Sequence, residues 1–68
     1  MKAVSGRRLA QLAERKGWSL ARVAGSHHIY IKEGRDERVV IPVHGNRPLK
    51  IGLQRHLMKI IPVSGEEL

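Results

Sequence analysis

Residues 18–43 read WSLARVAGSHHIYIKEGRDERVVIPV, and this stretch decides the fold. Its alternating or β-branched runs are separated by two turn signals, Gly25-Ser26 and Gly34-Arg35-Asp36. Such runs between glycine-containing turns are typical of short antiparallel strands joined by hairpins. Pro42 lacks the N–H that a strand ladder needs, so the third strand is expected to lie at a sheet edge or to end there. The stretch therefore predicts a three-stranded meander over residues 18–24, 27–32 and 38–43.

A first helix is predicted before this meander. Ser5 is a favoured N-cap residue, and good helix formers follow it up to Lys16. Gly17 then suits the left-handed backbone conformation that commonly follows a helix end, and Trp18 is expected to fold back onto the helix. The apolar stripe of the helix contains Leu9, Leu12 and Ala13. The polar side chains lie mostly off this stripe: Arg7, Arg8, Gln11, Glu14 and Arg15.

A second helix is predicted after the meander, over residues 50–61, and Pro62 ends it. Its apolar stripe has the spacing i, i+4, i+7 and i+8, with Leu53, Leu57, Ile60 and Ile61. His56 lies beside this stripe and is expected to be half-buried. Residues 63–68 are expected to form a frayed tail. The predicted fold is α+β, an α-β-β-β-α chain with both helices on one face of a three-stranded antiparallel sheet.

The composition of the chain limits its class. Its 68 residues predict one domain spanning residues 1–68. The absence of cysteine excludes disulfides, cysteine-ligated zinc and a cysteine nucleophile. No apolar run approaches the ~18 residues of a membrane span, and no signal-peptide pattern is present. The protein is therefore expected to be cytoplasmic, without a membrane partner.

Positive charge dominates the chain, with 13 Lys and Arg against 6 Asp and Glu and a formal net charge of +7. Apart from Glu14, the acids are confined to residues 33–37 and 66–67. A domain this basic attracts polyanions, which makes nucleic acid the leading class of partner. A solvated surface, or a basic face for an acidic protein, explains the same charge, and charge alone does not separate these interpretations.

The four histidines are the side-chain type that changes its charge nearest to neutral pH. His27 and His28 are adjacent, so a strand sends them to opposite faces. If the isoleucines of this strand point toward the helices, His27 shares their face, and His28 points the other way with Tyr30 and Lys32. His28 would then meet a charged substrate beside a lysine. Alternatively, His27 and His28 are ordinary polar residues near a strand end. His44 ends the third strand, where a loop could bring it toward the Gly25-Ser26 turn, and the alternative is an ordinary surface-loop histidine.

Several common chemistries lack their sequence motif. There is no HxH or HExxH zinc pattern, no GxGxxG or phosphate-binding loop, and no nucleophile elbow around Ser26, which is better explained as a turn residue. The sequence therefore predicts no metal and no cofactor. Metal-free general acid–base chemistry on a phosphodiester remains, for which one histidine and basic side chains suffice. RNA is the favoured substrate because its 2′-OH supplies an internal nucleophile.

Several segments resemble the small HicA toxins of prokaryotic toxin–antitoxin pairs. They are Gly17-Trp18, the motif GSHHIY at residues 25–30, the motif VIPVHGN at residues 40–46, and Leu49-Lys50-x-Gly52. The resemblance runs from Ser5 to the C-terminal end and covers nearly the whole chain. It implies a fold like that of double-stranded-RNA-binding domains. It also implies a ribonuclease that cleaves mRNA, arrests translation and is held inactive by a HicB antitoxin.

The resemblance also implies which residue is catalytic. The active-site histidine of the family falls on the second histidine of the G-S-[H/N]-H motif, which is His28 here. As a general base, His28 is expected to take the 2′-OH proton of RNA and leave a cyclic phosphate. Arg22 and Lys32 are expected to bind RNA phosphates near His28. Further RNA contacts are assigned to Ser26, His44 and Lys50.

Two other functions are kept open at this point. One is a non-catalytic RNA-binding module of the same fold, and the other is a domain whose positive face binds an acidic protein. RNA-binding modules of this fold generally resemble one another in a lysine cluster at the start of the last helix, where this chain has Lys50 alone. An acidic reading frame beside the gene would favour the toxin over both alternatives.

Overall fold

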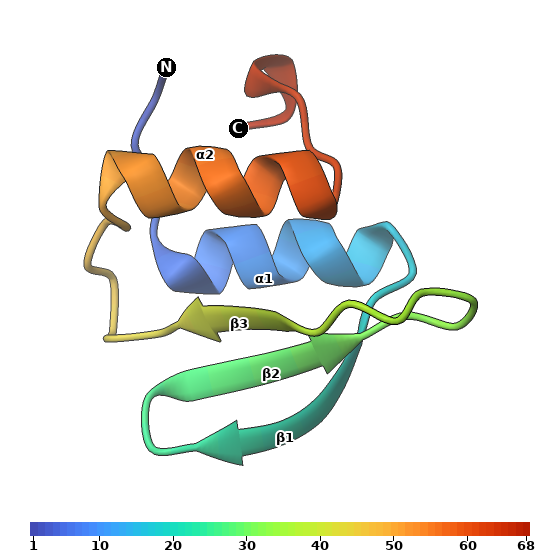
Figure 1. The fold of residues 1–68 in the computed structure, drawn as a ribbon. Coiled ribbons are helices and arrows are strands. Elements are labelled where there is room, and N and C mark those ends of the chain that lie inside the picture. Colours follow the sequence, from blue (N-terminus) through green and yellow to red (C-terminus); the bar gives the residue numbers. More distant parts are fainter.

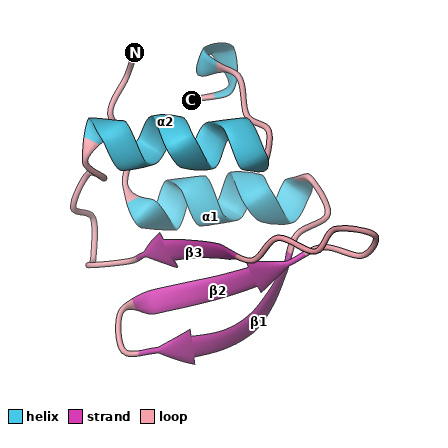
Figure 2. Cartoon of the chain, in the orientation of Figure 1, coloured by secondary structure: helices cyan, strands magenta, loops and turns pink.

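Two helices lie side by side on one face of a three-stranded antiparallel sheet (Figure 1). The structure is a computed structural model and describes residues 1–68. Figure 2 shows the same two layers, with no helix on the other side of the sheet. The elements are α1 (Gly6–Arg15), β1 (Ser19–Ala24), β2 (His27–Ile31), β3 (Val39–Pro42), α2 (Ile51–Ile60) and the 3₁₀ helix η1 (Gly65–Glu67). The predicted α+β fold and its α-β-β-β-α order are confirmed.

Both ends of α1 carry the predicted signals. The Ser5 Oγ accepts a hydrogen bond from a backbone N–H of the first turn (3.1 Å), as an N-cap side chain does. Beyond the helix, Gly17 has a φ of 95° and its N–H donates to the Glu14 carbonyl (3.1 Å). The Trp18 N–H donates to the Ala13 carbonyl (3.0 Å). These two bonds form a Schellman motif, which reverses the chain and turns Trp18 back toward the helix.

The edge position of β3 makes β2 the central strand of the sheet. The strand order is β1-β2-β3, and β3 ends at Pro42 as predicted, because proline cannot donate to the ladder. The face that β2 turns toward the helices therefore decides which side chains of the sheet are buried.

β2 turns His28 and Tyr30 toward the helices, and the prediction that its isoleucines point inward is wrong. Directly paired residues of antiparallel strands share a face. His28 pairs with Ile41 and Tyr30 pairs with Val39, and both β3 residues are buried. The isoleucines lie on the open face with His27. Alternation shows which residues share a face but not which face is covered, and here the large ring of Tyr30, only 2% exposed, takes the buried position.

The core lies between the helices and the sheet and contains both aromatic residues. The indole N–H of Trp18 donates to the Ile61 carbonyl (2.9 Å), beside the end of α2. This bond satisfies the polar end of the ring, so the ring can be buried without an unpaired donor. The buried apolar residues form one cluster: Val4, Leu9, Ala10, Leu12, Ala13, Trp18, Tyr30, Val39, Ile41, Leu49, Leu57, Met58, Ile61 and Val63.

α2 packs its predicted apolar stripe against the core, with Leu57 and Ile61 buried and Leu53 and Ile60 partly buried. Gln54 and Met58 are buried as well, which the sequence did not predict. Gln54 is fully buried because its side chain binds the N-terminal segment. Its Oε1 accepts from the Val4 N–H (3.0 Å), and its Nε2 donates to the Lys2 carbonyl (2.7 Å). His56 is exposed, so the prediction of a half-buried histidine is wrong. Neither helix is long and apolar enough to cross a membrane.

The C-terminal tail is packed against the fold, and the prediction that it frays is wrong. Val63 is buried, and Leu68 packs against the core cluster. In η1 the Glu67 carboxylate pairs with the Lys16 ammonium (2.8 Å) and accepts from the Ser64 N–H (3.1 Å). The contact with Lys16 joins residues far apart in the chain, so local sequence does not reveal it.

Gly6 allows α1 to approach the end of β3 closely. This glycine is buried, and a Cβ at its position would collide with the carbonyl group of Pro42. The first turn of α1 therefore lies directly against the chain that leaves β3. This contact sets the position of α1 over the sheet.

The substitution Gly6→Ala is expected to destabilise the fold by about 1–3 kcal/mol, the usual cost of overpacking. Gly52→Ala is the matched control, because Gly52 lies in the first turn of α2 and a Cβ there meets nothing within 4 Å. The control should stabilise the protein by up to about 1 kcal/mol. Urea unfolding measures both changes, and equal stabilities of the two variants would contradict the close contact.

Candidate functional site

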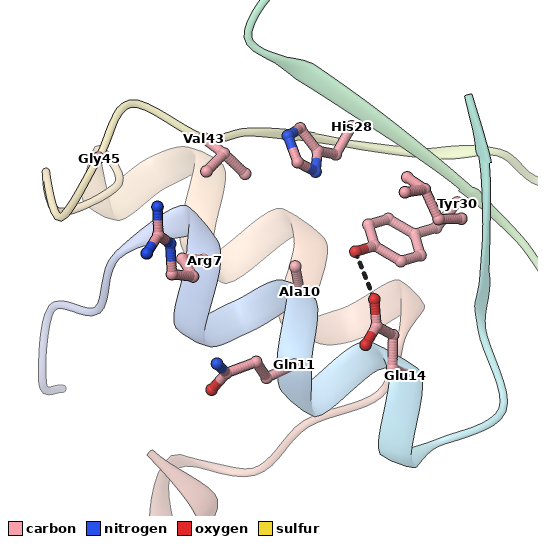
Figure 3. Close-up of a pocket in the computed structure, with 9 residues that line it drawn as sticks. Arg7, Ala10, Gln11, Glu14, His28, Tyr30, Val43 and Gly45 are labelled. Carbon is pink, nitrogen blue, oxygen red and sulfur yellow. Dashed lines mark hydrogen bonds between the residues drawn. The ribbon is translucent and has the colours of Figure 1, made fainter. Parts of the chain in front are cut away.

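A pocket of about 440 Å³ opens between α1 and the helix-facing side of β2 (Figure 3). α1 supplies one wall, β2 supplies the opposite wall, and the chain after β3 closes one end. The side chains that carry polar groups into this pocket are Arg7, Gln11, Glu14, His28 and Tyr30. A pocket of this size falls in the usual range for small-molecule sites.

The helical repeat explains why α1 lines the pocket with polar groups. Arg7, Gln11 and Glu14 stand at i, i+4 and i+7, so they follow one side of the helix. Ala10 lies among them and is buried, and its small side chain leaves room above the helix (Figure 3). The residues at the border between the apolar and polar sides of α1 therefore form the α1 wall of the pocket.

Tyr30 and Glu14 are joined across the pocket. The Tyr30 hydroxyl donates a hydrogen bond to the Glu14 Oε2 (2.8 Å), drawn as the dashed line in Figure 3. Burial of the tyrosine, followed by this hydrogen bond and the charge of the carboxylate, raises the pKa of Tyr30 from 10.0 to about 12. Tyr30 therefore stays protonated near neutral pH and acts as a donor that holds the Glu14 carboxylate in place.

His28 lies half-buried in the wall opposite α1. Figure 3 shows its ring directed into the space above the helix, between Val43 and Tyr30. His27, next to it in the sequence, is exposed on the other face of the sheet. The prediction that the two histidines point to opposite faces is confirmed, but His28 faces the helices rather than open solvent.

Arg7 is a free cation at the end of the pocket nearest Gly45 (Figure 3). The structure contains two ion pairs, Lys16–Glu67 and Arg35–Glu37, and neither involves Arg7. A guanidinium with no carboxylate partner can bind a phosphate through two parallel hydrogen bonds. The pocket thus combines an anion-binding group, an imidazole and a carboxylate in one place.

A second pocket, also of about 440 Å³, lies on the other side of the loop that follows β3. His44, Arg47 and Lys50 line it together. Two of these residues were expected from the sequence to bind RNA, and the structure brings them together with Arg47, which the sequence analysis missed. The loop begins beside the Gly25-Ser26 turn, because the Val43 N–H donates to the Ser26 carbonyl (2.8 Å).

The other expected RNA contacts lie outside both pockets. Arg22 pairs with Ile29 and therefore faces the open side of the sheet, so the expectation that it lies beside His28 is wrong. A register shift between Leu20 and Arg22 reverses the alternation that would have placed it on the helix side. Lys32 follows β2 and lies beside Gly17, at the C-terminal end of α1. Ser26 is half-buried in its turn.

Sequence reasoning missed the α1 side of the site. Arg7, Gln11 and Glu14 lie off the apolar stripe of α1. Local sequence does not distinguish them from ordinary polar residues on a solvent-exposed helix face. Their i, i+4, i+7 spacing was the available signal, but it becomes informative only once Tyr30 is known to face α1. No three His, Asp or Glu side chains lie together in an arrangement that could hold a metal ion.

The fold and the site together define a small, basic α-β-β-β-α protein with a histidine in a pocket beside its first helix. A family model described as the HicA toxin of bacterial toxin-antitoxin systems matches residues 6–62. The chain therefore belongs to the HicA toxin family, and the resemblance carried by the GSHHIY and VIPVHGN motifs is confirmed. Its role is that of a toxin that pairs with an antitoxin. A search of curated proteins found no match to this chain.

The state of Tyr30 gives a direct test of the pocket geometry. Because this is the only tyrosine, ultraviolet absorbance reports its ionisation alone, and we expect a pKa of about 12 instead of 10.0. The raised pKa stabilises the folded state below pH 10, and that contribution is lost as the pH rises from 10 toward 12. Glu14→Gln should lower the pKa of Tyr30, because it removes the negative charge. A midpoint near 10 in the folded wild type would show that the pair does not form.

Proposed function

We propose that this toxin is a metal-independent endoribonuclease that cleaves mRNA in the cytoplasm and so arrests translation, with His28 as a general acid/base. The observation that carries the proposal is the position of His28, half-buried in a pocket whose α1 wall presents the unpaired cation Arg7. An imidazole can move a proton while a guanidinium holds the scissile phosphate. The 2′-OH of RNA then displaces the 5′-oxygen and leaves a 2′,3′-cyclic phosphate.

The distribution of charge supports a nucleic-acid substrate. The formal net charge of +7 draws a polyanion toward the protein at long range. At short range, the second pocket adds His44, Arg47 and Lys50 on the far side of the loop at residues 43–48. An RNA strand that crosses this loop would meet Arg7 with one phosphate and Lys50 with another. Ser26, at the adjoining turn, lies along the same edge.

Lys32 and Arg22 are proposed as contacts to more distant parts of the RNA. Lys32 lies beyond Tyr30 at the Gly17 end of α1, and Arg22 lies on the open face of the sheet. Neither side chain lines the His28 pocket. Their contribution is therefore electrostatic attraction of the RNA rather than positioning of the scissile phosphate.

The antitoxin is proposed to act by covering the His28 pocket. The pocket is open, and a basic protein of this size is silenced most simply by an acidic surface that occupies it. Such a HicB-like partner would exclude RNA and pair the free cations at the same time.

The variant His28→Ala should lose RNA cleavage and toxicity, with a fall in rate of about 10²–10⁴-fold, the usual contribution of an acid–base group. His27→Ala is the matched control, because His27 is the neighbouring residue on the opposite face and should cleave close to the wild-type rate. Purified proteins are compared on a defined RNA in the presence of EDTA, after their unfolding curves have been shown to agree.

Three outcomes would contradict the proposal. The first is cleavage by folded His28→Ala protein at the wild-type rate, and the second is loss of wild-type cleavage in EDTA. The third is wild-type protein that binds RNA without cutting it, which would establish the non-catalytic RNA-binding module instead.

RNA affinity should fall steeply with salt, because binding through phosphates releases counterions. Arg7→Ala and Lys50→Ala should each weaken binding and reduce the slope of log affinity against log salt by about 1. Arg38→Ala is the control, since Arg38 is exposed before β3 and lines neither pocket. Fluorescence anisotropy with labelled RNA at several salt concentrations measures the slopes. Salt-independent binding would rule out the phosphate contacts.

A further inference from the structure

The His28 pocket contains a carboxylate to which the proposed function assigns no role. Glu14 lines the same cavity as His28 and is the only acidic residue there. Its Oε2 accepts from Tyr30, and its Oε1 makes no hydrogen bond in the structure. Glu14 is also the only acid between residues 1 and 32. The Glu14 carboxylate is therefore held in place by one oxygen, while its other oxygen is free to accept a proton from a bound substrate.

We propose that Glu14 is the general base of the cleavage reaction, and that His28 is the general acid. This inference rests on the proposed ribonuclease function and completes it. It moves the base role from His28, where the sequence analysis placed it, to the carboxylate on α1.

One histidine suffices for some catalysis, but two proton-transfer groups in different places assist both halves of the reaction. In an in-line displacement at phosphorus, the attacking 2′-oxygen and the leaving 5′-oxygen lie on opposite sides of the phosphorus atom. One imidazole cannot reach both oxygens in a single transition state. Full acid–base assistance therefore takes a base on the side of the 2′-OH and an acid on the side of the leaving group.

Two side chains of the pocket have the chemistry of a general acid or base, a carboxylate and an imidazole. The charged or titratable side chains that face Glu14 are Arg7 from α1, and His28 and Tyr30 from β2. Leu20 of β1, with Val43 and Gly45 after β3, adds none. The Arg7 guanidinium has donors but no acceptor atom. Burial raises the pKa of Tyr30 to about 12, and its hydroxyl already donates to Glu14, so it is not the base. Glu14 and His28 remain.

The two groups come from opposite walls. Glu14 projects from α1 and His28 from β2, and Figure 3 shows the cavity between them. Arg7 lies two helical turns from Glu14, or about 10 Å along the axis, at the other end of the cavity. A phosphate placed between the walls would therefore have a carboxylate on one side, an imidazole on the other, and a guanidinium to hold its oxygens.

Tyr30 is a positioning residue in this arrangement. Its ring is fixed in the core, and its hydroxyl donates to the Glu14 Oε2 at 2.8 Å. The carboxylate is thereby held on the pocket side of α1 with Oε1 free to accept. This is the usual way in which a neighbouring group orients a catalytic base.

The proton balance of the step is complete. The Glu14 Oε1 takes the proton of the 2′-OH, and the 2′-oxygen forms a bond to phosphorus. The bond between phosphorus and the 5′-oxygen breaks, and protonated His28 gives its proton to that oxygen. The products are a 2′,3′-cyclic phosphate and a 5′-OH, and exchange with water restores both side chains. No oxidant, reductant or further reactant is needed.

The first test is Glu14→Gln, because the amide oxygen can still accept from Tyr30 while the base is lost. Glu33→Gln is the matched control, an exposed acid of the loop between β2 and β3. With the unfolding curve unchanged, Glu14→Gln should cleave RNA at least about 10²-fold more slowly than wild type. It should bind RNA at least as tightly, because a negative charge has gone. The acid limb of the pH profile of kcat/KM should disappear while the alkaline limb stays.

A second test separates the two roles and does not depend on a single variant. A ribonucleoside 3′-aryl phosphate carries a leaving group that needs no protonation. On this substrate His28→Ala should regain most of the wild-type rate, whereas Glu14→Gln should stay slow. Rescue of the Glu14 variant instead of the His28 variant would overturn the assignment.

The outcomes also distinguish this inference from the function on which it rests. If wild-type protein cuts RNA and His28→Ala does not, but Glu14→Gln cuts at the wild-type rate or keeps both limbs of its pH profile, only the role of Glu14 is overturned. If the wild type cuts no RNA, the proposed function fails and the role of Glu14 fails with it.

Discussion

The burial of Tyr30, with its hydroxyl bonded to Glu14, is the interaction on which the rest of the structure depends. β2 is the central strand, so the face it turns inward sets the inward face of the strands paired with it. Once the tyrosine ring enters the core, His28 must also face the helices, because it stands two residues earlier on the same strand. The same burial makes a partner for the hydroxyl necessary, and Glu14 supplies it at 2.8 Å.

The position of α1 over this face follows from contacts at its two ends. At the start, Gly6 lets the backbone of the helix lie against the Pro42 carbonyl. At the other end, the Schellman motif turns Trp18 into the core, where its indole donates to the chain after α2. Held in this way, α1 packs its apolar side on the core and leaves its polar border over β2. The pocket is the space that remains between that border and the strand.

The site divides its tasks among elements of different rigidity. The groups proposed to transfer protons project from a helix and a central strand, whose hydrogen bonds fix their geometry, whereas the cations of the second pocket come from a loop and the start of α2. Rigid elements suit groups that must meet one phosphate accurately, and looser ones suit attraction of a long polyanion. The chain belongs to the HicA toxin family, whose members pair with an antitoxin, and the proposed antitoxin site is this same open pocket.

The sequence by itself determined the features that depend on near neighbours. Caps, turns and alternation within a few residues predict the order of the elements, both ends of α1 and the end of β3 at Pro42. The motif that contains His28 is also visible in the sequence itself. Tertiary structure decided which face of β2 is covered, the face of Arg22, the burial of Gln54 and the packing of the tail. Each of these depends on groups far apart in the chain: Tyr30 with Glu14, Gln54 with Val4 and Lys2, Lys16 with Glu67. Alternation fixes which side chains point together, but only packing against distant segments decides which of the two faces is buried.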